Sequence, residues 1–178
     1  RERILSMTTI IMHETEDEVL IAFDSRVSGS RVPPDTSYAQ KVFINPAADI
    51  ILGVAGYLRA AQVLAYADLP AIDEHDWDVD RYVTMELLPA MHEVVNTYGD
   101  EDDTDYSRFL AVVRGRVYDI EGGSWTRNPS GVYGIGTGSD YAIGAYAAGA
   151  DLAEAVEIAA EFDAATNDDV TVWEVTSD

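Results

Sequence analysis

The chain has 178 residues, of which 47% are hydrophobic, so it is long enough to bury the core of one globular domain. It carries 33 acidic residues against 11 basic ones, and this formal net charge of -22 argues against binding to nucleic acid or to an anionic membrane. Cysteine is absent, which excludes disulfides and thiolate metal sites. No apolar run approaches the roughly 18 residues of a membrane span, and no signal peptide is visible, so we expect a cytoplasmic protein.

The acidic residues are spread along the chain, with the highest local density over residues 73–80 and 100–105. A solvated acidic surface is the simpler interpretation, and an acidic rim that faces a partner is the alternative. Lysine is almost absent beside this excess of acidic residues, which is a composition that also fits a host living in high salt.

Residues 1–7 carry no structural pattern and are predicted to be an N-terminal leader or a vector-derived remnant, ahead of a single domain over residues 8–178. Two apolar runs at residues 9–12 and 19–23 flank a polar turn, which predicts a β-hairpin. A loop rich in serine, glycine and proline follows at residues 28–37.

Two further strands are predicted at residues 41–45 and 50–54. From Tyr57 the apolar residues recur with a helical period until Leu69-Pro70. A second long helix is predicted over residues 78–97, and Pro89 inside it predicts a kink or a break.

The last third of the chain begins with two strands at residues 109–113 and 116–120, joined by a tight Arg114-Gly115 turn. The remaining predicted elements are a strand at 132–135, a small-residue helix at 140–148, a helix at 152–164 capped by Asp151, and a strand at 170–175. Strands and helices therefore come in blocks. This order favours an α+β fold with antiparallel sheets and helices packed outside them.

Several common kinds of site have no support in the sequence. The three histidines lie in a turn, in an acidic loop and on the polar side of a helix, which does not suit a serine–histidine triad. The turn over residues 136–139 lacks the Gly-Lys-Ser/Thr ending of a phosphate-binding loop. No standard metal motif is present, although the carboxylates within residues 163–169 could hold a weakly bound cation.

A threonine at a free N-terminus offers catalysis without histidine. Its α-amino group, with a pKa near ~8, can act as the base for its own hydroxyl. A buried lysine can hold the hydroxyl and the developing negative charge, and a carboxylate beside that lysine keeps it charged. Thr8, Asp24 and Lys41 are the residue types that this mechanism needs, and Lys41 is the only lysine in the chain.

The chain resembles the proteasome β-type subunits, and most closely the bacterial proteasome-like (HslV-like) N-terminal-nucleophile threonine proteases. The resemblance runs from Thr8 to Val175 through six motifs in the family's order. These are Thr8-Thr9-Ile10, Asp24-x-Arg26 sixteen residues after Thr8, Lys41-Val42, Ala55-Gly56, Gly136-Thr137-Gly138-Ser139-Asp140-Tyr141-Ala142, and Asp163-Ala164-Ala165-Thr166.

The resemblance implies a four-layer α/β/β/α sandwich and a role for each matched residue. Thr8 would be the nucleophile, with Asp24 and Lys41 completing the triad. The backbone N–H of Gly56 would bind the oxyanion. Three side chains would orient the Thr8 amine and a catalytic water, namely Thr137, Asp163 and Thr166. The main specificity pocket would be lined by Val27, Val54 and Leu58, which favours an apolar residue before the scissile bond.

The family also implies an assembly, a homo-oligomeric double ring of six or seven subunits with an ATPase unfoldase ring that delivers unfolded protein substrates. No cofactor is implied. Met7 stands where self-processing subunits carry glycine, so we expect Met7 to be removed by an aminopeptidase. A chain that begins at Arg1 is expected to be inactive, because its Thr8 has no free amine.

Two alternatives remain open at the level of the sequence. The chain could be a catalytically silent scaffold or interaction subunit with the proteasome fold. It could also be a non-proteolytic amide hydrolase of the same fold.

Overall fold

The computed structural model describes residues 5–6, 8–26, 40–75, 77–99 and 107–176. The predicted loop at residues 28–37 and the acidic cluster at 100–105 lie outside these ranges, as does most of the predicted leader.

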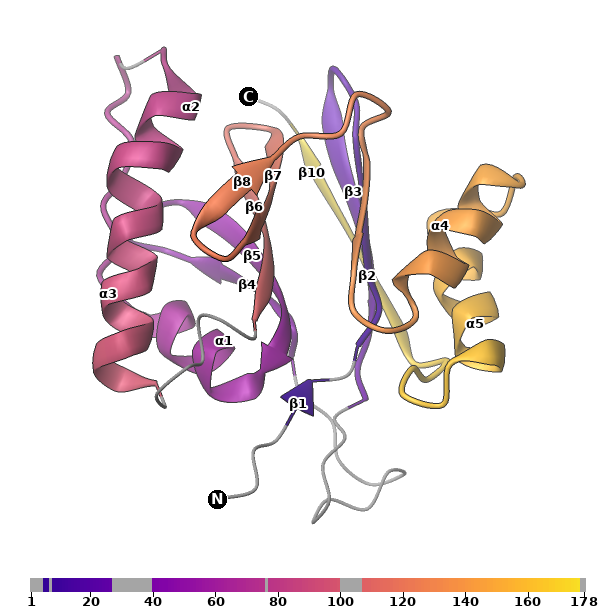
Figure 1. Cartoon of the computed structure of the whole chain (residues 1–178). Helices are drawn as coiled ribbons and strands as arrows, with labels where there is room; N and C mark the ends of the chain where they lie inside the picture. The colour runs from indigo at the N-terminus through magenta and orange to yellow at the C-terminus, as the bar shows by residue number, and fades with distance from the viewer. Residues whose placement is uncertain (1–4, 7, 27–39, 76, 100–106, 177–178) are drawn as a thin grey trace.

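Two β-sheets stack face to face, and helices cover the outer face of each (Figure 1). On one side lie α1 (Leu58–Tyr66), α2 (Val79–Tyr82), the π-helical segment η1 (Val83–Leu87) and α3 (Leu88–Tyr98). On the other side lie α4 (Ser139–Ala147) and α5 (Leu152–Phe162). Asp151 caps α5 as predicted, through a reciprocal capping box with Glu154.

Every strand pairing in the described residues is antiparallel. The first sheet has the order β1-β5-β6-β7-β8, and β4 pairs with β5 on the same side as β1. Its strands are β1 (Leu5–Ser6), β4 (Val42–Asn45), β5 (Ile50–Tyr57), β6 (Arg108–Val113), β7 (Arg116–Glu121) and β8 (Ser124–Thr126). The second sheet has the order β10-β3-β2-β9. Its strands are β2 (Ile10–Glu14), β3 (Glu18–Asp24), β9 (Val132–Ile135) and β10 (Val170–Thr176).

Three apolar clusters fill the three gaps between the four layers. Leu52, Leu64 and Leu87 belong to the cluster between the first sheet and α1–α3. Ile10, Ile21 and Leu110 belong to the cluster between the two sheets. A third cluster joins the second sheet to α4 and α5 and consists of Ile11, Ala22, Ala142, Leu152, Ala155, Val156 and Ala159. Both faces of each sheet are therefore buried, which confirms the predicted α/β/β/α sandwich.

The structure departs from the predicted elements in three places. The single helix predicted over residues 78–97 contains a π-helical segment that ends two residues before Pro89. Because proline lacks the N–H of a regular helical hydrogen bond, a locally wider turn accommodates it while the helix continues. The short strand β8 was not predicted, and neither was β1, which lies within the segment that had no pattern of its own.

Candidate active site

The hairpin formed by β2 and β3 brings Thr8 beside Asp24. Thr9 is the residue before β2, and Asp24 is the last residue of β3. The Thr9 N–H donates to Asp24 Oδ1 at 2.9 Å, and the Asp24 N–H donates to the Thr9 carbonyl at 3.2 Å. The Thr8 hydroxyl in turn donates to Asp24 Oδ1 at 3.4 Å, with both residues fully buried.

Lys41 reaches the same carboxylate from the other sheet. It directly precedes β4, and its carbonyl accepts the Val54 N–H at 3.0 Å, which fixes it against β5. Its Nζ lies 2.7 Å from Asp24 Oδ1. Burial lowers the pKa of Lys41 to about 8, although the attraction of Asp24 opposes that change. The ammonium group is therefore charged but close to titration at neutral pH, which suits a group that exchanges hydrogen bonds with a reacting hydroxyl.

Gly56 lies near the end of β5, where its register partner is Ser6 of β1. Leu5 is paired in the same way with Tyr57. Two residues of the predicted leader are thus an extended strand along the edge of β5, at the glycine whose N–H is expected to bind the oxyanion.

Asp163 directly follows α5 and accepts hydrogen bonds from two threonine hydroxyls. Thr137 and Thr166 each donate to Asp163 Oδ2 at 2.7 Å, and the Ala165 N–H donates to Oδ1 at 3.1 Å. Partial burial raises the pKa of Asp163, but these hydrogen bonds and the charge of Lys41 outweigh it and hold the pKa below the usual value. Asp163 is therefore a carboxylate at neutral pH.

Thr9 connects this cluster to the start of β2. Its hydroxyl oxygen lies 2.6 Å from the hydroxyl oxygen of Thr166. Since Thr166 uses its hydrogen on Asp163, Thr9 must be the donor in this contact. The hydroxyls of Thr9 and Thr166 and the Asp163 carboxylate thus form a chain of hydrogen bonds beside Thr8.

The two glycines that flank Thr137 pack so closely against Thr8, Thr9 and Thr166 that neither position has room for a Cβ atom. A Cβ on Gly136 would come within 1.9 Å of the Thr8 carbonyl oxygen, and Gly136 has a φ of +94°. A Cβ on Gly138 would come within 2.1 Å of the Thr9 hydroxyl and 2.6 Å of the Thr166 hydroxyl. The Gly-Thr-Gly turn is therefore a contact surface for Thr8 and Thr9.

The second oxygen of Asp24 is held by two backbone N–H groups, and one of them belongs to a residue that the sequence did not single out. The N–H groups of Arg26 and Asn167 donate to Oδ2 at 3.1 and 3.2 Å. Asn167 lies in the turn between α5 and β10, one residue after the matched Asp-x-x-Thr motif. No signal in a single sequence would have found it, because its contact with Asp24 is made by the backbone.

The three predicted pocket residues differ in their surroundings. Val27 lies outside the described residues. Val54 is buried in the core between the first sheet and its helices. Leu58, the first residue of α1, is partly exposed beside Gln62 and Tyr66. Their role in substrate specificity stays a prediction.

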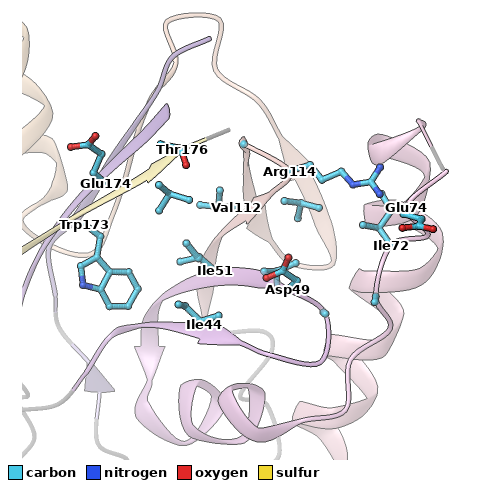
Figure 2. Close-up of a pocket in the computed structure, with 16 residues that line it drawn as sticks. Ile44, Asp49, Ile51, Ile72, Glu74, Val112, Arg114, Trp173, Glu174 and Thr176 are labelled. Atoms are coloured by element: carbon cyan, nitrogen blue, oxygen red, sulfur yellow. The ribbon is translucent and has the colours of Figure 1, made fainter. Parts of the chain in front are cut away.

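A separate groove of about 770 Å³ lies between the sheets, where Trp173 of β10 faces Ile44 and Ile51 (Figure 2). In the register of β10 with β3, Val170 pairs with Asp24, whereas Trp173 pairs with Ile21. The part of β10 that lines this groove therefore lies farther along β3, away from Asp24. None of the predicted site residues is among those that line it in the described part of the chain. The groove is therefore not part of the Thr8 site.

Neither a metal cluster nor a membrane helix occurs in the part of the chain that the structure describes. Within these ranges no three acidic or histidine side chains are grouped as metal ligands. Asp163 and Asp169, two carboxylates of the weak cation site considered above, bind hydroxyl groups instead. No described helix is long and apolar enough to cross a membrane.

Comparison with known proteins gives the class of the fold. The sequence matches no family model and no curated protein. Solved structures do match over nearly the whole chain. HslV from Trypanosoma brucei has a TM-score of 0.66 at 21% identity, over 94% of this chain and 99% of that chain. BPH from Thiobacillus denitrificans, solved in complex with epoxomicin, has a TM-score of 0.70 at 17% identity, over 96% and 99% of the two chains.

Anbu, an ancestral beta-subunit from Yersinia bercovieri, has a TM-score of 0.66 at 14% identity and covers 94% of this chain and 81% of that chain. The chain therefore has a proteasome-like fold of the HslV type, which confirms the fold that the resemblance in the sequence implied.

Proposed function

We propose that the chain is the threonine protease subunit of a ring-shaped, self-compartmentalising peptidase. The observation that carries the proposal is the convergence of Thr8, Asp24 and Lys41, which come from both sheets and meet at one buried carboxylate oxygen. A buried lysine paired with a carboxylate beside a hydroxyl is one arrangement that supports nucleophilic catalysis without histidine.

The proposed reaction begins with a free Thr8 amine. The amine accepts the hydroxyl proton as Thr8 Oγ1 attacks the carbonyl carbon of a peptide bond, while Lys41 stabilises the developing charge on that oxygen. The Gly56 N–H holds the carbonyl oxygen as it becomes negative. The amine then gives its proton to the leaving nitrogen, the C–N bond breaks, and an ester on Thr8 remains. Water, oriented by the Asp163 cluster, hydrolyses this ester and restores the hydroxyl.

Met7 decides whether this reaction can start. While Met7 is attached, the Thr8 nitrogen belongs to a peptide bond and cannot act as a base. The pairing of Leu5 and Ser6 with β5 adds a second obstacle, because it uses the edge of β5 at Gly56, which an extended substrate would need. The form that retains residues 1–7 is therefore expected to be inactive.

The experiment compares three proteins in hydrolysis of a fluorogenic peptide amide. One begins at Thr8 after cleavage of a removable fusion, one retains residues 1–7, and one carries Thr8→Ala in the cleaved background. Only the first is expected to be active. Epoxomicin, which BPH from Thiobacillus denitrificans holds in its complex, is the test ligand and should suppress that activity. Equal activity of the Thr8→Ala protein would remove Thr8 from the mechanism.

The accompanying proposal concerns assembly and substrate. A cytoplasmic double ring of six or seven subunits, fed by an ATPase ring, would confine hydrolysis to unfolded proteins. Negative-stain imaging gives the number of subunits in the ring. An unfolded casein should be degraded faster than a small amide is cleaved by the assembled protein, and the opposite preference would favour a non-proteolytic amide hydrolase.

A further inference from the structure

Asn167 holds the turn before β10 against the end of β3 with both atoms of its amide group. Its Oδ1 accepts the Ser25 N–H at 3.2 Å, and its Nδ2 donates to the Ser25 hydroxyl oxygen at 3.2 Å. Ser25 donates its own hydroxyl hydrogen to Asp169 Oδ2 at 2.7 Å, so its hydroxyl both accepts from Asn167 and donates to Asp169. The two chain segments are 142 residues apart in sequence, yet this amide fixes their separation.

The same contact fixes where the backbone of Asn167 meets Asp24. Ser25 is the neighbour of Asp24, so an amide that is bound to Ser25 also holds the Asn167 N–H on Asp24 Oδ2 at 3.2 Å. Asp24 is thereby gripped at both oxygens, with Lys41 and the Thr9 N–H on Oδ1 and two backbone N–H groups on Oδ2. A carboxylate held at both oxygens cannot rotate away from its lysine without losing hydrogen bonds.

We propose that Asn167 is a positioning residue for the nucleophile site, which acts through Ser25 and Asp24 to hold the carboxylate against Lys41. This inference rests on the proposed function in that Asp24 and Lys41 serve Thr8. It assigns no contact with substrate to Asn167. The sequence motif shared with the proteasome-like proteins ends at Thr166, so the motif itself does not include this residue.

The charge of Lys41 is the quantity that Asn167 should control. The charged groups that act on Lys41 include Asp24 and Arg26 at the end of β3 and Asp163 after α5. Asp24 and Asp163 favour the ammonium form, whereas Arg26 and burial oppose it. Replacing Asn167 leaves these groups in the chain but removes the side chain that holds the N–H of residue 167 on Asp24 Oδ2. The pKa of Lys41 should then fall below its value of about 8.

Lys41 can be followed directly because it is the only lysine of the chain. Protein labelled with ¹³C at the lysine Cε gives one lysine signal, whose shift with pH reports the Lys41 pKa without any substrate. The variants are Asn167→Ala, which removes both hydrogen bonds to Ser25, and Ser25→Ala, which removes the bond from Nδ2 but keeps the Ser25 N–H bond to Oδ1. The matched control is Asn128→Ala, since Asn128 also holds a loop through both atoms of its amide, at Ser130 and Val132.

We expect Asn167→Ala to lower the Lys41 pKa by roughly half a unit or more, and Ser25→Ala to lower it by less. The double variant should lower it no further than Asn167→Ala, because that variant already removes both hydrogen bonds of the Asn167 amide. Asn128→Ala should leave it unchanged. In the protein that begins at Thr8, Asn167→Ala should reduce kcat about tenfold with little change in KM.

An unchanged Lys41 pKa in Asn167→Ala would overturn the inference, even if activity fell. An equal fall in Asn128→Ala would overturn it as well, because the effect would then be general loosening. If the protein that begins at Thr8 hydrolyses no amide, the proposed function fails, whereas the lysine titration still decides the role of Asn167.

Discussion

Lys41 Nζ lies 2.7 Å from Asp24 Oδ1, with neither side chain exposed to solvent. The pair joins the two sheets, since Asp24 ends β3 in one and Lys41 precedes β4 in the other. Burial makes the charged lysine less favourable than it is in water, and Asp24 restores only part of the difference. At neutral pH the buried, charged Lys41 therefore lowers the free energy of unfolding. A contact with only a structural role would not require a buried charge.

This cost gives the protein a measurable pH dependence. Native Lys41 loses its proton near pH 8, whereas the ordinary lysine pKa that applies to the unfolded chain is 10.5. Between these values the unfolded state binds more protons, so the free energy of unfolding should rise with pH. The slope from one such proton is about 1.4 kcal/mol per pH unit. Denaturant unfolding at a series of pH values from 7 upward measures it.

Tyrosines contribute with the opposite sign at higher pH. Burial raises the pKa of Tyr82 to about 12, above its model-compound value of 10.0, so this group lowers stability only as the pH passes 10.0. The comparison should therefore stop below that pH. Lys41→Met is the control, and the rise in stability attributed to Lys41 should be missing from it. A rise of equal slope in Lys41→Met would assign the effect to other groups.

The Gly-Thr-Gly turn supplies a second prediction, on packing. Gly138→Ala should destabilise the protein by about 1–3 kcal/mol, because the added methyl group overlaps the hydroxyls of Thr9 and Thr166. Gly144→Ala in α4 is the matched control, since a Cβ at that position has no neighbour within 4 Å. Helix propensity predicts that the control gains about 0.5–1 kcal/mol. Urea unfolding of both variants tests the pair, and equal effects would contradict the packing argument.

Much of this fold could be predicted from the sequence because local patterns determine it. Apolar runs such as the one around Ile21, and the helical period around Leu64, identified most strands and helices. The Asp151 cap was predicted because a cap depends on its own neighbours. The strand β1 was not, since Leu5 and Ser6 become a strand only through pairing with β5.

The residues of the candidate site also fall into those that the sequence could identify and those that it could not. Thr8, Asp24 and Lys41 could be selected by residue type and spacing, because the proposed chemistry needs an amine, a carboxylate and a hydroxyl. Asn167 could not, because its side chain acts on Ser25 and its backbone acts on Asp24. Such contacts depend on the turn between α5 and β10 meeting the end of β3, and no local pattern reports that meeting.

The capping box of α5 makes a third prediction, which concerns the helix layer that follows the Gly-Thr-Gly turn. Asp151→Ala removes the acceptor for the Glu154 N–H, a hydrogen bond of 2.9 Å, and should cost about 1 kcal/mol. Asp151→Ser keeps an acceptor and should cost less. Thermal or urea unfolding followed by circular dichroism measures both, and equal losses would show that the hydroxyl cannot replace the carboxylate here.

The Asp163 cluster gives the last prediction. Asp163→Asn loses the negative charge, and its NH₂ group must face either the two threonine hydroxyls or the Ala165 N–H, so one side of the cluster loses its acceptor. In the protein that begins at Thr8, the disrupted cluster should misplace the amine and the attacking water and reduce kcat by about 10²-fold. Because the pKa of Asp163 lies below its usual value of 3.8, its own ionisation should not contribute to the activity profile at neutral pH.

Asp140→Asn is the control for Asp163→Asn, since Asp140 is an exposed aspartate in the first turn of α4, two residues after Gly138. It should retain nearly full activity. Steady-state kinetics of both variants, with folding checked by circular dichroism, separate the two positions. A small effect at Asp163 would mean that the Thr8 amine is oriented by Asp24 and Lys41 alone, because the threonine hydroxyls would then have no catalytic consequence. A large effect in kcat with little change in KM would instead tie the turn after α5 to the chemistry of Thr8.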